Sequence, residues 1–333
     1  MSGGFVAYHQ RLNKAVERHL FMEMLSSVNR YKPVSEYTYV GFGGAFLEDF
    51  KLIHERFGNQ SMISIEGDPL ILKRQRFNKP LSCITCLAKT SGDFIVNYDI
   101  EESAIVWLDY ANPRQVNDQL REFQSLLSKM QPFDILKLTL NADPNALRDS
   151  HSVDEQGKLE NADTRNQKRL VRLRDRIKAF LPEDISPEQT SQNGLPILLA
   201  SAVEYASSQA LRAHKGMEFL PLTILVYTDT HQMLTVTGIL LPESGKSDFM
   251  KQTKIDKWGL WAENWATLHR INLPSLTIRE RLFIDRLLHK YDEKRIHRRL
   301  GFLFTPDEDT SLESLKNYVR FYRQYSSFHR VIF

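Results

Sequence analysis

The sequence has few cysteines, no long apolar run and little net charge, and each shortage excludes a class of protein. It contains two cysteines among 333 residues, and its formal net charge is +3. Two cysteines cannot build the disulfide framework of a small secreted domain. No apolar run approaches the roughly 20 residues that cross a bilayer, and the N-terminus lacks the basic and apolar regions of a secretory signal. We therefore expect a cytoplasmic protein that does not enter a membrane.

Cys83 and Cys86 form a Cys-x-x-Cys pair, but their context favours neither a metal nor a redox site. A four-ligand zinc site needs a second pair at matching spacing, and none follows in the sequence. A redox pair lies at a helix N-terminus, whereas residues 81–87 form an apolar run typical of a strand. Side chains three apart on a strand point to opposite faces, so we expect two buried structural thiols.

The most informative segment is a glycine-rich turn that follows an apolar run. The turn contains Gly41, Gly43 and Gly44, and a helix at 46–57 separates it from a second apolar run that ends in Glu66 and Asp68. This order is the opening of a nucleotide-binding βαβ unit. Glycines let the backbone approach a ligand, and a carboxylate after the second strand can accept both ribose hydroxyls. The alternative is an ordinary strand-turn-helix whose glycines only relieve crowding.

Strands and helices alternate through the first 140 residues, which predicts an α/β fold with a Rossmann-like, doubly wound and mostly parallel sheet. Two β-rich runs at 222–227 and 233–241, joined by a short turn, predict an antiparallel hairpin that closes the sheet. Dinucleotide dehydrogenases usually add a parallel crossover at this point, so the hairpin disfavours an NAD-dependent enzyme. The five earlier strands are expected at 37–40, 62–65, 82–87, 104–108 and 134–140.

Three parts are expected along the chain. They are an N-terminal helical cap at 1–36, a Rossmann-like domain at 37–245 with an insertion at 145–194, and a C-terminal helical region at 246–333.

Several helices outside the core follow from apolar periodicity. We expect them at 9–30, 277–299 and 312–324, and we expect a polar turn at 89–93. The insertion should contain an amphipathic helix with a basic outer surface. Its apolar face would consist of Leu170, Leu173, Ile177 and Phe180.

Five alternating strands and a closing hairpin resemble the layout of class I S-adenosylmethionine-dependent methyltransferases. Within that superfamily the chain is similar to a group of bacterial proteins classed as O-methyltransferases, over most of its length. The similarity implies S-adenosylmethionine as the cofactor and an oxygen as the methyl acceptor, while no motif identifies the acceptor molecule or an oligomeric state. The motifs that carry it are Tyr39-Val-Gly-Phe-Gly-Gly-Ala-Phe-Leu-Glu-Asp-Phe, Ile63-Ser-Ile-Glu-Gly-Asp, Arg74-Gln-Arg-Phe-Asn and Trp107-Leu-Asp-Tyr.

The resemblance implies a role for each residue that matches a family motif. Glu66 would hold the ribose hydroxyls, with Asp68 as the second candidate, and Asp93 would face the adenine. Asp109 would lie beside the reactive methyl group. The loop beneath the methionine part of the cofactor would consist of Gly41, Gly43 and Gly44.

Three side chains could remove the proton of a hydroxyl acceptor: Asp109, Asp143 and His231. Each also has a structural explanation, since Asp109 could cap the following helix and His231 could simply be exposed on the hairpin turn. Hard oxygen ligands from Asp109, Asn141 and Asp143 would suit Mg²⁺, but their spacing is unspecific and no metal is predicted.

A second hypothesis belongs to another class, a methyltransferase-like scaffold that binds nucleic acid or a partner protein without turnover. Tyr39 stands where the family motif has an acid, and Ala45 stands at the third glycine position. The basic segments 165–178 and 286–299 could contact phosphates. Charged helices more often face water, so we expect at most weak, sequence-independent nucleic-acid binding.

Overall fold

The computed structural model describes residues 11–147 and 161–325, and the chain divides into two compact units. Within the described residues the first unit comprises 22–226 and His231–His269, and the second comprises 11–21, Tyr227–Thr230 and 270–325. The expected helix at 9–30 begins before the described residues. None of the described helices has the length and apolar character needed to span a bilayer.

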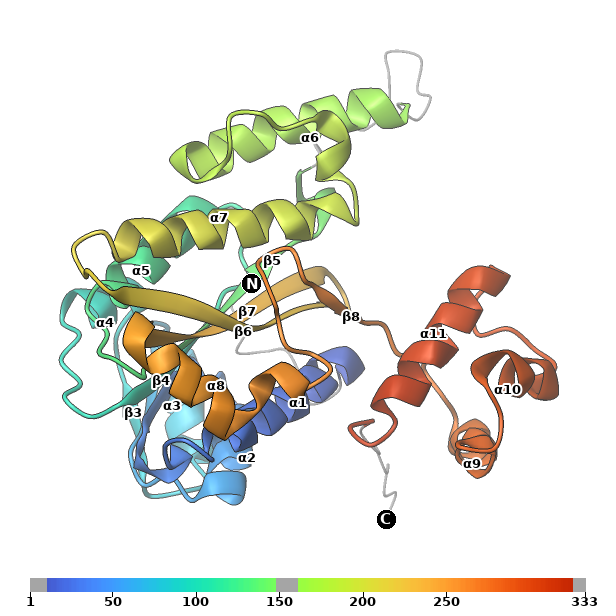
Figure 1. The fold of residues 1–333 in the computed structure, drawn as a ribbon, viewed down its shortest axis with the longest axis horizontal. Helices are drawn as coiled ribbons and strands as arrows, with labels where there is room; N and C mark the ends of the chain where they lie inside the picture. Colours follow the sequence, from blue (N-terminus) through green and yellow to red (C-terminus); the bar gives the residue numbers. More distant parts are fainter. Residues whose placement is uncertain (1–10, 148–160, 326–333) are drawn as a thin grey trace. The chain divides into compact units, whose positions relative to one another are not determined.

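An eight-stranded sheet forms the centre of the first unit (Figure 1), in the order β3-β2-β1-β4-β5-β7-β6-β8. The first five strands pair in parallel, and β7 pairs antiparallel with β5. The expected α/β, Rossmann-like sheet with a closing antiparallel hairpin is therefore confirmed. The strands are β1 (Thr38–Gly41), β2 (Met62–Ile65), β3 (Ile84–Leu87), β4 (Ala104–Asp109), β5 (Ile135–Asn141), β6 (Met217–Thr228), β7 (Gln232–Pro242) and β8 (His269–Ile271).

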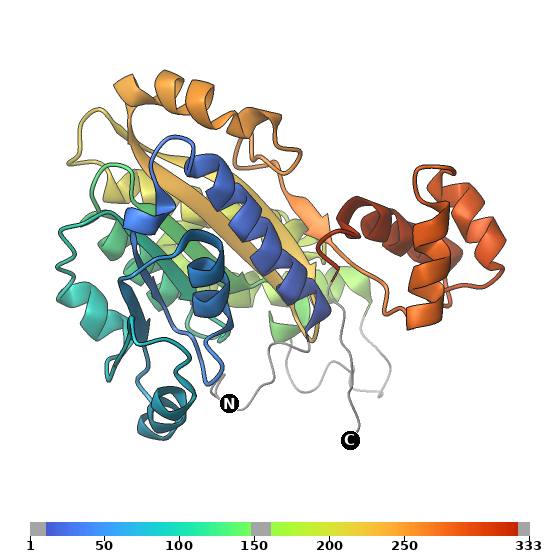
Figure 2. The ribbon, with the colours of Figure 1, turned by 90° about the horizontal axis from the view of Figure 1, so that it is seen from below.

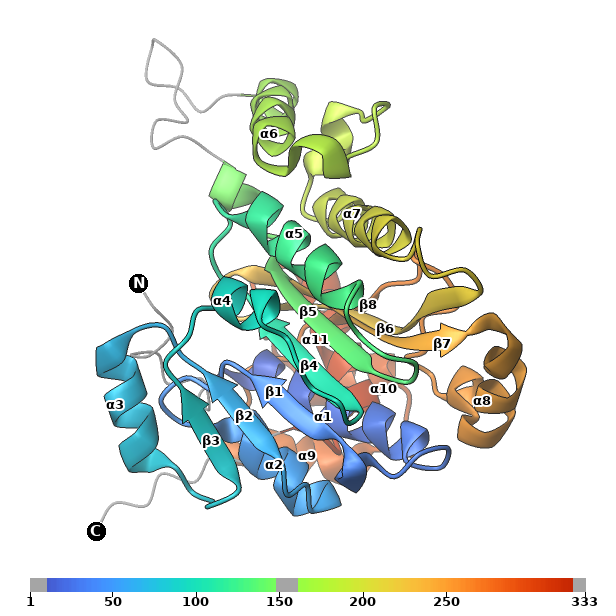
Figure 3. The same ribbon diagram turned by 90° about the vertical axis from the view of Figure 1, so that its left-hand side faces the viewer.

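Helices cover both faces of the sheet and bury its central strands on both sides. Figure 3 shows α4 (Ser91–Val96), α5 (Val116–Leu127) and α7 (Gly194–Ala210) along one face. The opposite face, seen in Figure 2, is covered by α2 (Glu48–Phe57), α8 (Lys246–Thr253) and the second half of α1 (Leu12–Val28). The main core lies between the sheet and the α4–α5–α7 layer.

The crossover between β2 and β3 contains α3 (Pro69–Asn78), which begins at a cap formed by Asp68. The insertion contains α6 (Ala162–Ile177), which packs outside α5 and α7 (Figure 1). The expected apolar face is confirmed for Leu170, Leu173 and Ile177, which are buried on α6, whereas Phe180 is buried in the 3-10 turn that follows the helix.

Two local predictions are wrong. The polar turn expected at 89–93 is the start of α4, because the Thr90 hydroxyl accepts the Asp93 N–H at 3.1 Å and begins the helix. Cys83 and Cys86 are partly exposed rather than buried, since β3 lies at the edge of the sheet. Burial of part of Cys86 raises the pKa of its thiol.

The single helix expected at 277–299 is also wrong, because two helices occupy this range. They are α9 (Ile278–Leu287) and α10 (Glu293–Leu300). His289 adopts a left-handed conformation with φ +63°, which no helix continues. The Asp292 carboxylate then accepts the Arg295 N–H at 2.8 Å and begins α10.

The second unit is a small helical assembly in which α11 (Glu308–Phe321) contacts both α9 and α10. The Tyr318 hydroxyl of α11 donates to Asp285 of α9 at 2.6 Å. Leu315 and Tyr318 are fully buried, as is Ile296 of α10. The unit therefore has an apolar centre of its own.

Candidate functional site

The turn after β1 depends on two adjacent glycines with positive φ, Gly43 at +62° and Gly44 at +53°. A Cβ on Gly43 would lie 2.5 Å from Leu47 Cδ2 and 2.6 Å from Ser64 Oγ, so no side chain fits there. A Cβ on Gly44 would meet no atom within 4 Å. Packing inside the protein thus disfavours a side chain at Gly43, whereas no protein atom crowds the position of a side chain at Gly44, so a ligand can approach the backbone there. Leu47 is left-handed as well, and such strain clusters at ligand sites.

Side chains from α3 and β2 hold the carbonyl groups of this glycine turn. Gln75 Nε2 donates to Phe42 O at 3.1 Å and to Gly44 O at 2.9 Å. Asn78 Nδ2 donates to Ala45 O at 2.8 Å, and Ser64 Oγ donates to Phe42 O at 3.2 Å. The turn is therefore fixed by the protein itself before any ligand arrives.

The motif Arg74-Gln-Arg-Phe-Asn thus acquires a role that the sequence did not reveal. Gln75 and Asn78 are three residues apart on α3 and share one face of the helix. Gln75 is fully buried, and a buried amide needs partners of this kind. Two amides at helical spacing were the available signal, but nothing in the sequence connects them with a turn 31 and 33 residues away.

A carboxylate lies beneath the glycine turn, although β1 carries Tyr39 rather than an acid. The Tyr39 hydroxyl donates a hydrogen bond to Asp49 of α2, and both residues are buried. A Cβ on Gly41 would lie 3.1 Å from Tyr39 Oη and 3.3 Å from Asp49 Oδ2. The helix after the turn therefore brings a carboxylate next to Gly41.

The two acids after β2 have different surroundings. Glu66 is partly buried, and its carboxylate accepts the Asp68 N–H at 2.8 Å. Burial raises the pKa of Glu66, while backbone hydrogen bonds from Asp68 and Gly67 oppose the shift. The Asp68 carboxylate caps α3 by accepting the N–H groups of Leu70 and Ile71.

Asp93, expected near an adenine, lies in the first turn of α4 and is exposed. Its carboxylate accepts the Thr90 hydroxyl at 2.7 Å. This contact fixes the loop after β3 but brings Asp93 into no contact with the glycine turn.

The end of β4 brings an aromatic residue against the glycine turn. Asp109 is the last residue of this strand and is partly buried, and α5 begins after Gln115, so Asp109 does not cap that helix. The Tyr110 ring meets the Phe42 ring edge to face with centroids 5.4 Å apart. The Tyr110 hydroxyl donates to Glu122, and burial together with that carboxylate raises the Tyr110 pKa.

The end of β5 brings two of the candidate bases together. His231 Nδ1 lies 3.1 Å from Asp143 Oδ2. The antiparallel register of β5 and β7 places Asn141 opposite Met233 and so brings the hairpin turn to the end of β5. The His231 side chain is 58% exposed and that of Asp143 only 10%, so the histidine is accessible to solvent and the carboxylate is largely buried. Asp143 is oriented further by accepting the Asn145 N–H at 2.9 Å.

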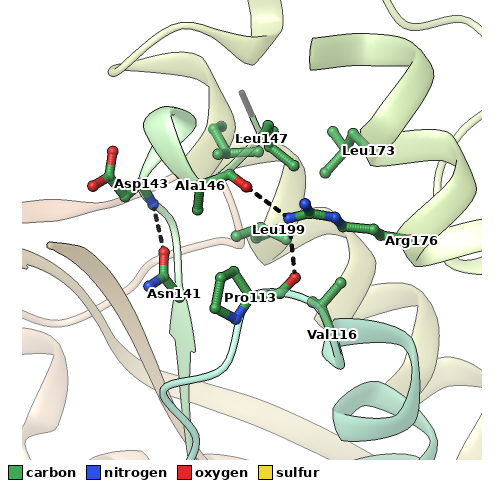
Figure 4. A pocket seen from close by; sticks show the side chains of 10 residues that line it. Pro113, Val116, Asn141, Asp143, Ala146, Leu147, Leu173, Arg176 and Leu199 are labelled. Atoms are coloured by element: carbon green, nitrogen blue, oxygen red, sulfur yellow. Dashed lines mark hydrogen bonds between the residues drawn. The ribbon is translucent and has the colours of Figure 1, made fainter. Parts of the chain in front are cut away.

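A small pocket lies between the loops after β4 and β5 and the insertion (Figure 4). Arg176 of α6 donates to Ala146 O at 2.9 Å and to Pro113 O at 3.4 Å, which joins the two loops. Burial, then the neighbouring Arg172 and Arg114, lowers the pKa of Arg176. Figure 4 shows Asn141 and Asp143 on the wall opposite Leu173 and Arg176. Among the described residues, no three His, Cys, Asp or Glu side chains gather closely enough to hold a metal ion.

Comparison with protein families gives one clear result. Residues 6–333 match the model of a family described as "Putative O-methyltransferase". A search of curated proteins gives no match.

Solved structures give weaker similarities. Trm1 from Pyrococcus horikoshii, solved with S-adenosyl-L-methionine, is 11% identical, with a TM-score of 0.44 over 74% of this chain and 59% of that one. An O-methyltransferase structure from Klebsiella pneumoniae is 10% identical, with a TM-score of 0.40 over 71% and 84%. The N-methyltransferase NodS from Bradyrhizobium japonicum is 8% identical, with a TM-score of 0.38 over 68% and 97%. The chain spans less than two thirds of the length of Trm1, and all three TM-scores are below 0.5, so family membership rests on the sequence match.

Proposed function

Because the chain belongs to the O-methyltransferase family matched over residues 6–333, its methyl donor is S-adenosylmethionine, and we propose that it transfers the methyl group to an oxygen atom. The observation that supports an oxygen acceptor is the Asp143–His231 pair at the carboxyl end of β5. Ligands of doubly wound sheets bind at that edge. A hydroxyl must lose its proton during methyl transfer, and this pair is suited to receive it.

For the cofactor, the turn with Gly41, Gly43 and Gly44 would lie beneath the methionine part. Its fit is supported by Gly44, whose backbone no side chain covers. Glu66 is the better of the two ribose candidates, because the Asp68 carboxylate already caps α3. Asp93 is proposed to face the adenine and Asp109 to lie near the methyl group.

S-adenosylmethionine, when bound, supplies a methyl group on a positively charged sulfur. The protein's part is to align the acceptor oxygen and to take its proton. If the Nδ1–H of His231 donates a hydrogen bond to the Asp143 carboxylate, Nε2 is the unprotonated nitrogen and can accept the acceptor's proton. Asp143 would then stabilise the resulting imidazolium.

The cofactor step is tested by isothermal titration with S-adenosylhomocysteine, with NAD and ATP as comparison ligands. We expect S-adenosylhomocysteine alone to bind, and Glu66→Gln to weaken it by about 1.5–3 kcal/mol as charge-assisted hydrogen bonds to ribose are lost. The acceptor atom is tested by transfer of a labelled methyl group to pools of hydroxyl, carboxyl and amine compounds. Label on nitrogen would overturn the oxygen assignment.

The scaffold hypothesis predicts no binding of S-adenosylhomocysteine. Part of its motive was Tyr39, and Asp49 places a carboxylate at the Tyr39 hydroxyl. Ala45 also fits the turn, since its carbonyl is held by Asn78. These contacts favour a working cofactor turn over a degenerate one.

A further inference from the structure

The second unit has an open surface pocket lined by one tyrosine and three arginines. Its volume is about 340 Å³, and the lining residues are Tyr291, Arg295, Arg298 and Arg299. The arginines share one exposed face of α10, because side chains three and four residues apart are neighbours on a helix. The other face buries Ile296 and His297 against the unit. The helix is therefore anchored, and its cationic face is directed away from the core.

Among the described residues, no ion pair neutralises the charge of this face. Within the part of the chain that the structure describes, none of these three guanidinium groups forms an ion pair. Asp292 is close in sequence, but it caps the helix by accepting the Arg295 N–H at 2.8 Å. Like charges at this spacing repel one another in the absence of a counterion. An anion in the pocket would remove that repulsion.

The tyrosine fixes one of the guanidinium groups in position. Arg299 lies 4.3 Å from the centroid of the Tyr291 ring, and its Nη2 donates to Tyr291 Oη at 3.2 Å. A guanidinium stacked on an aromatic ring is already ordered, so less entropy is lost when it binds a ligand. Its fork of donors matches the oxygens of a phosphate group.

The other basic segment of the chain, in α6, differs because two of its arginines bind backbone carbonyl groups of neighbouring loops. In α6 the Arg174 guanidinium donates to Glu183 O and that of Arg176 to Pro113 O and Ala146 O. These cations hold neighbouring loops. In α10 the Arg298 guanidinium donates from Nε to Lys294 O of the same helix at 3.4 Å. Arg298 and Arg299 therefore donate within residues 291–299, whereas Arg174 and Arg176 of α6 hold neighbouring loops.

We propose that this arginine pocket of α10 binds the phosphate group of a phosphate ester. Three cations within about one helical turn match the charge of a phosphate monoester, about −1.5 to −2, better than that of a single carboxylate. The phosphate can belong to a small phosphate ester or to the backbone of a nucleic acid. The inference is independent of the methyl-transfer proposal, because it concerns residues of the second unit.

The test uses the full chain in a low-salt buffer without phosphate, with two probes. Inorganic pyrophosphate is titrated calorimetrically, and a short labelled single-stranded RNA is followed by fluorescence anisotropy across a salt series. The variant R298Q/R299Q removes two cations from the pocket. The matched control R279Q/R286Q removes two exposed arginines of α9 in the same unit. Circular dichroism verifies that both variants are folded.

We expect pyrophosphate to bind the wild type and R279Q/R286Q, and R298Q/R299Q to bind at least about tenfold more weakly, because charge-assisted hydrogen bonds are lost. RNA that binds more tightly than pyrophosphate, with affinity falling steeply in salt, supports the site and identifies a nucleic-acid backbone. RNA no tighter than pyrophosphate supports it and identifies a small ester. Absence of pyrophosphate binding, or equal losses in the two double variants, would overturn the proposal.

Discussion

Gly43 and Gly44 are neighbours in the turn after β1, yet an added side chain would meet opposite surroundings at the two positions. At Gly43 it would collide with Leu47 and Ser64 inside the protein, while at Gly44 it would project into open space. Both residues have positive φ, which asparagine tolerates better than other side chains. Packing and ligand access can therefore be separated by substitutions one residue apart.

We predict that Gly43→Val destabilises the fold, whereas Gly44→Asn leaves it folded but weakens S-adenosylhomocysteine binding. The first variant overpacks a buried turn at a cost of about 1–3 kcal/mol. The second places an amide where a ligand would approach and should reduce affinity by about tenfold, or about 1.4 kcal/mol. Thermal melting and calorimetric titration of both variants measure the two effects. Full affinity in a folded Gly44→Asn protein would show that the ligand does not contact this part of the turn.

At the scale of elements, α3 holds the glycine turn after β1, although β2 lies between the two in the sequence. Gln75 and Asn78 hold three carbonyl groups of the turn, those of Phe42, Gly44 and Ala45. The helix in turn begins at the Asp68 cap, directly after β2. The glycine turn, the residues after β2 and α3 therefore form one hydrogen-bonded assembly.

We predict that Gln75→Ala reduces affinity for S-adenosylhomocysteine by about 0.5–1.5 kcal/mol for each hydrogen bond lost, because the turn is no longer fixed in advance. Hydrogen exchange of the turn amides should accelerate in the same variant. Lys73→Ala, an exposed change on the same helix, provides the control and should alter neither measurement. Unchanged exchange in Gln75→Ala would mean that the glycines alone define the turn.

The start of β4 is joined to the start of β5 by a buried acid that titrates unusually. Asp134 accepts the Ala104 N–H at 2.7 Å and the Gln131 N–H at 2.8 Å. Burial raises its pKa to about 6, although both hydrogen bonds and Lys32 oppose the shift. Folding therefore favours the protonated acid.

The sign of the pH dependence follows from this shift. A folded pKa of about 6 exceeds the unfolded value of about 3.9, so the stabilising contribution is complete below pH ~3.9 and is lost as pH rises through about 6, by up to about 3 kcal/mol. We predict that the wild type loses stability relative to Asp134→Asn between about pH 4 and about pH 7. Urea unfolding of both proteins across this range measures the difference, and parallel curves would contradict it.

Much of this element structure follows from the sequence, and the failures have local causes. Apolar runs predicted β2 at its observed bounds and the closing hairpin, because buried strands and a short turn leave clear patterns. The break between α9 and α10 was missed, since it depends on the conformation of His289 and the cap by Asp292. The roles of Gln75 and Asp49 were missed because they require knowing which elements are adjacent in space.

At the scale of the whole molecule, pairing of distant strands brings together the two proposed proton acceptors, Asp143 and His231. Asp143 and His231 are 88 residues apart, and the β5–β7 register brings them together. The sequence named each of them as a possible base, but not their contact. The insertion contributes Arg176 to the same region.

We predict that His231→Asn lowers the methyl-transfer rate constant by about 10²–10⁴-fold while affinity for S-adenosylhomocysteine is unchanged. Asp143→Asn should lower it less, because the imidazolium loses its partner while the proton-accepting nitrogen remains. Single-turnover measurements with the acceptor found by label transfer provide the rates. A His231→Asn protein with the full rate would move the proton-accepting role to Asp109.

The two sides of the site also differ in when they can form on a nascent chain. The clamp on the glycine turn joins residues 31 and 33 positions apart, so it can close while the rest of the chain is still being synthesised. The Asp143–His231 pair can form only after His231, 88 residues further along the chain, has been synthesised. Contacts of low sequence separation form early, and N-terminal portions fold first during synthesis. A ribosome-bound chain stalled between these points would therefore hold the formed glycine turn without the Asp143–His231 pair.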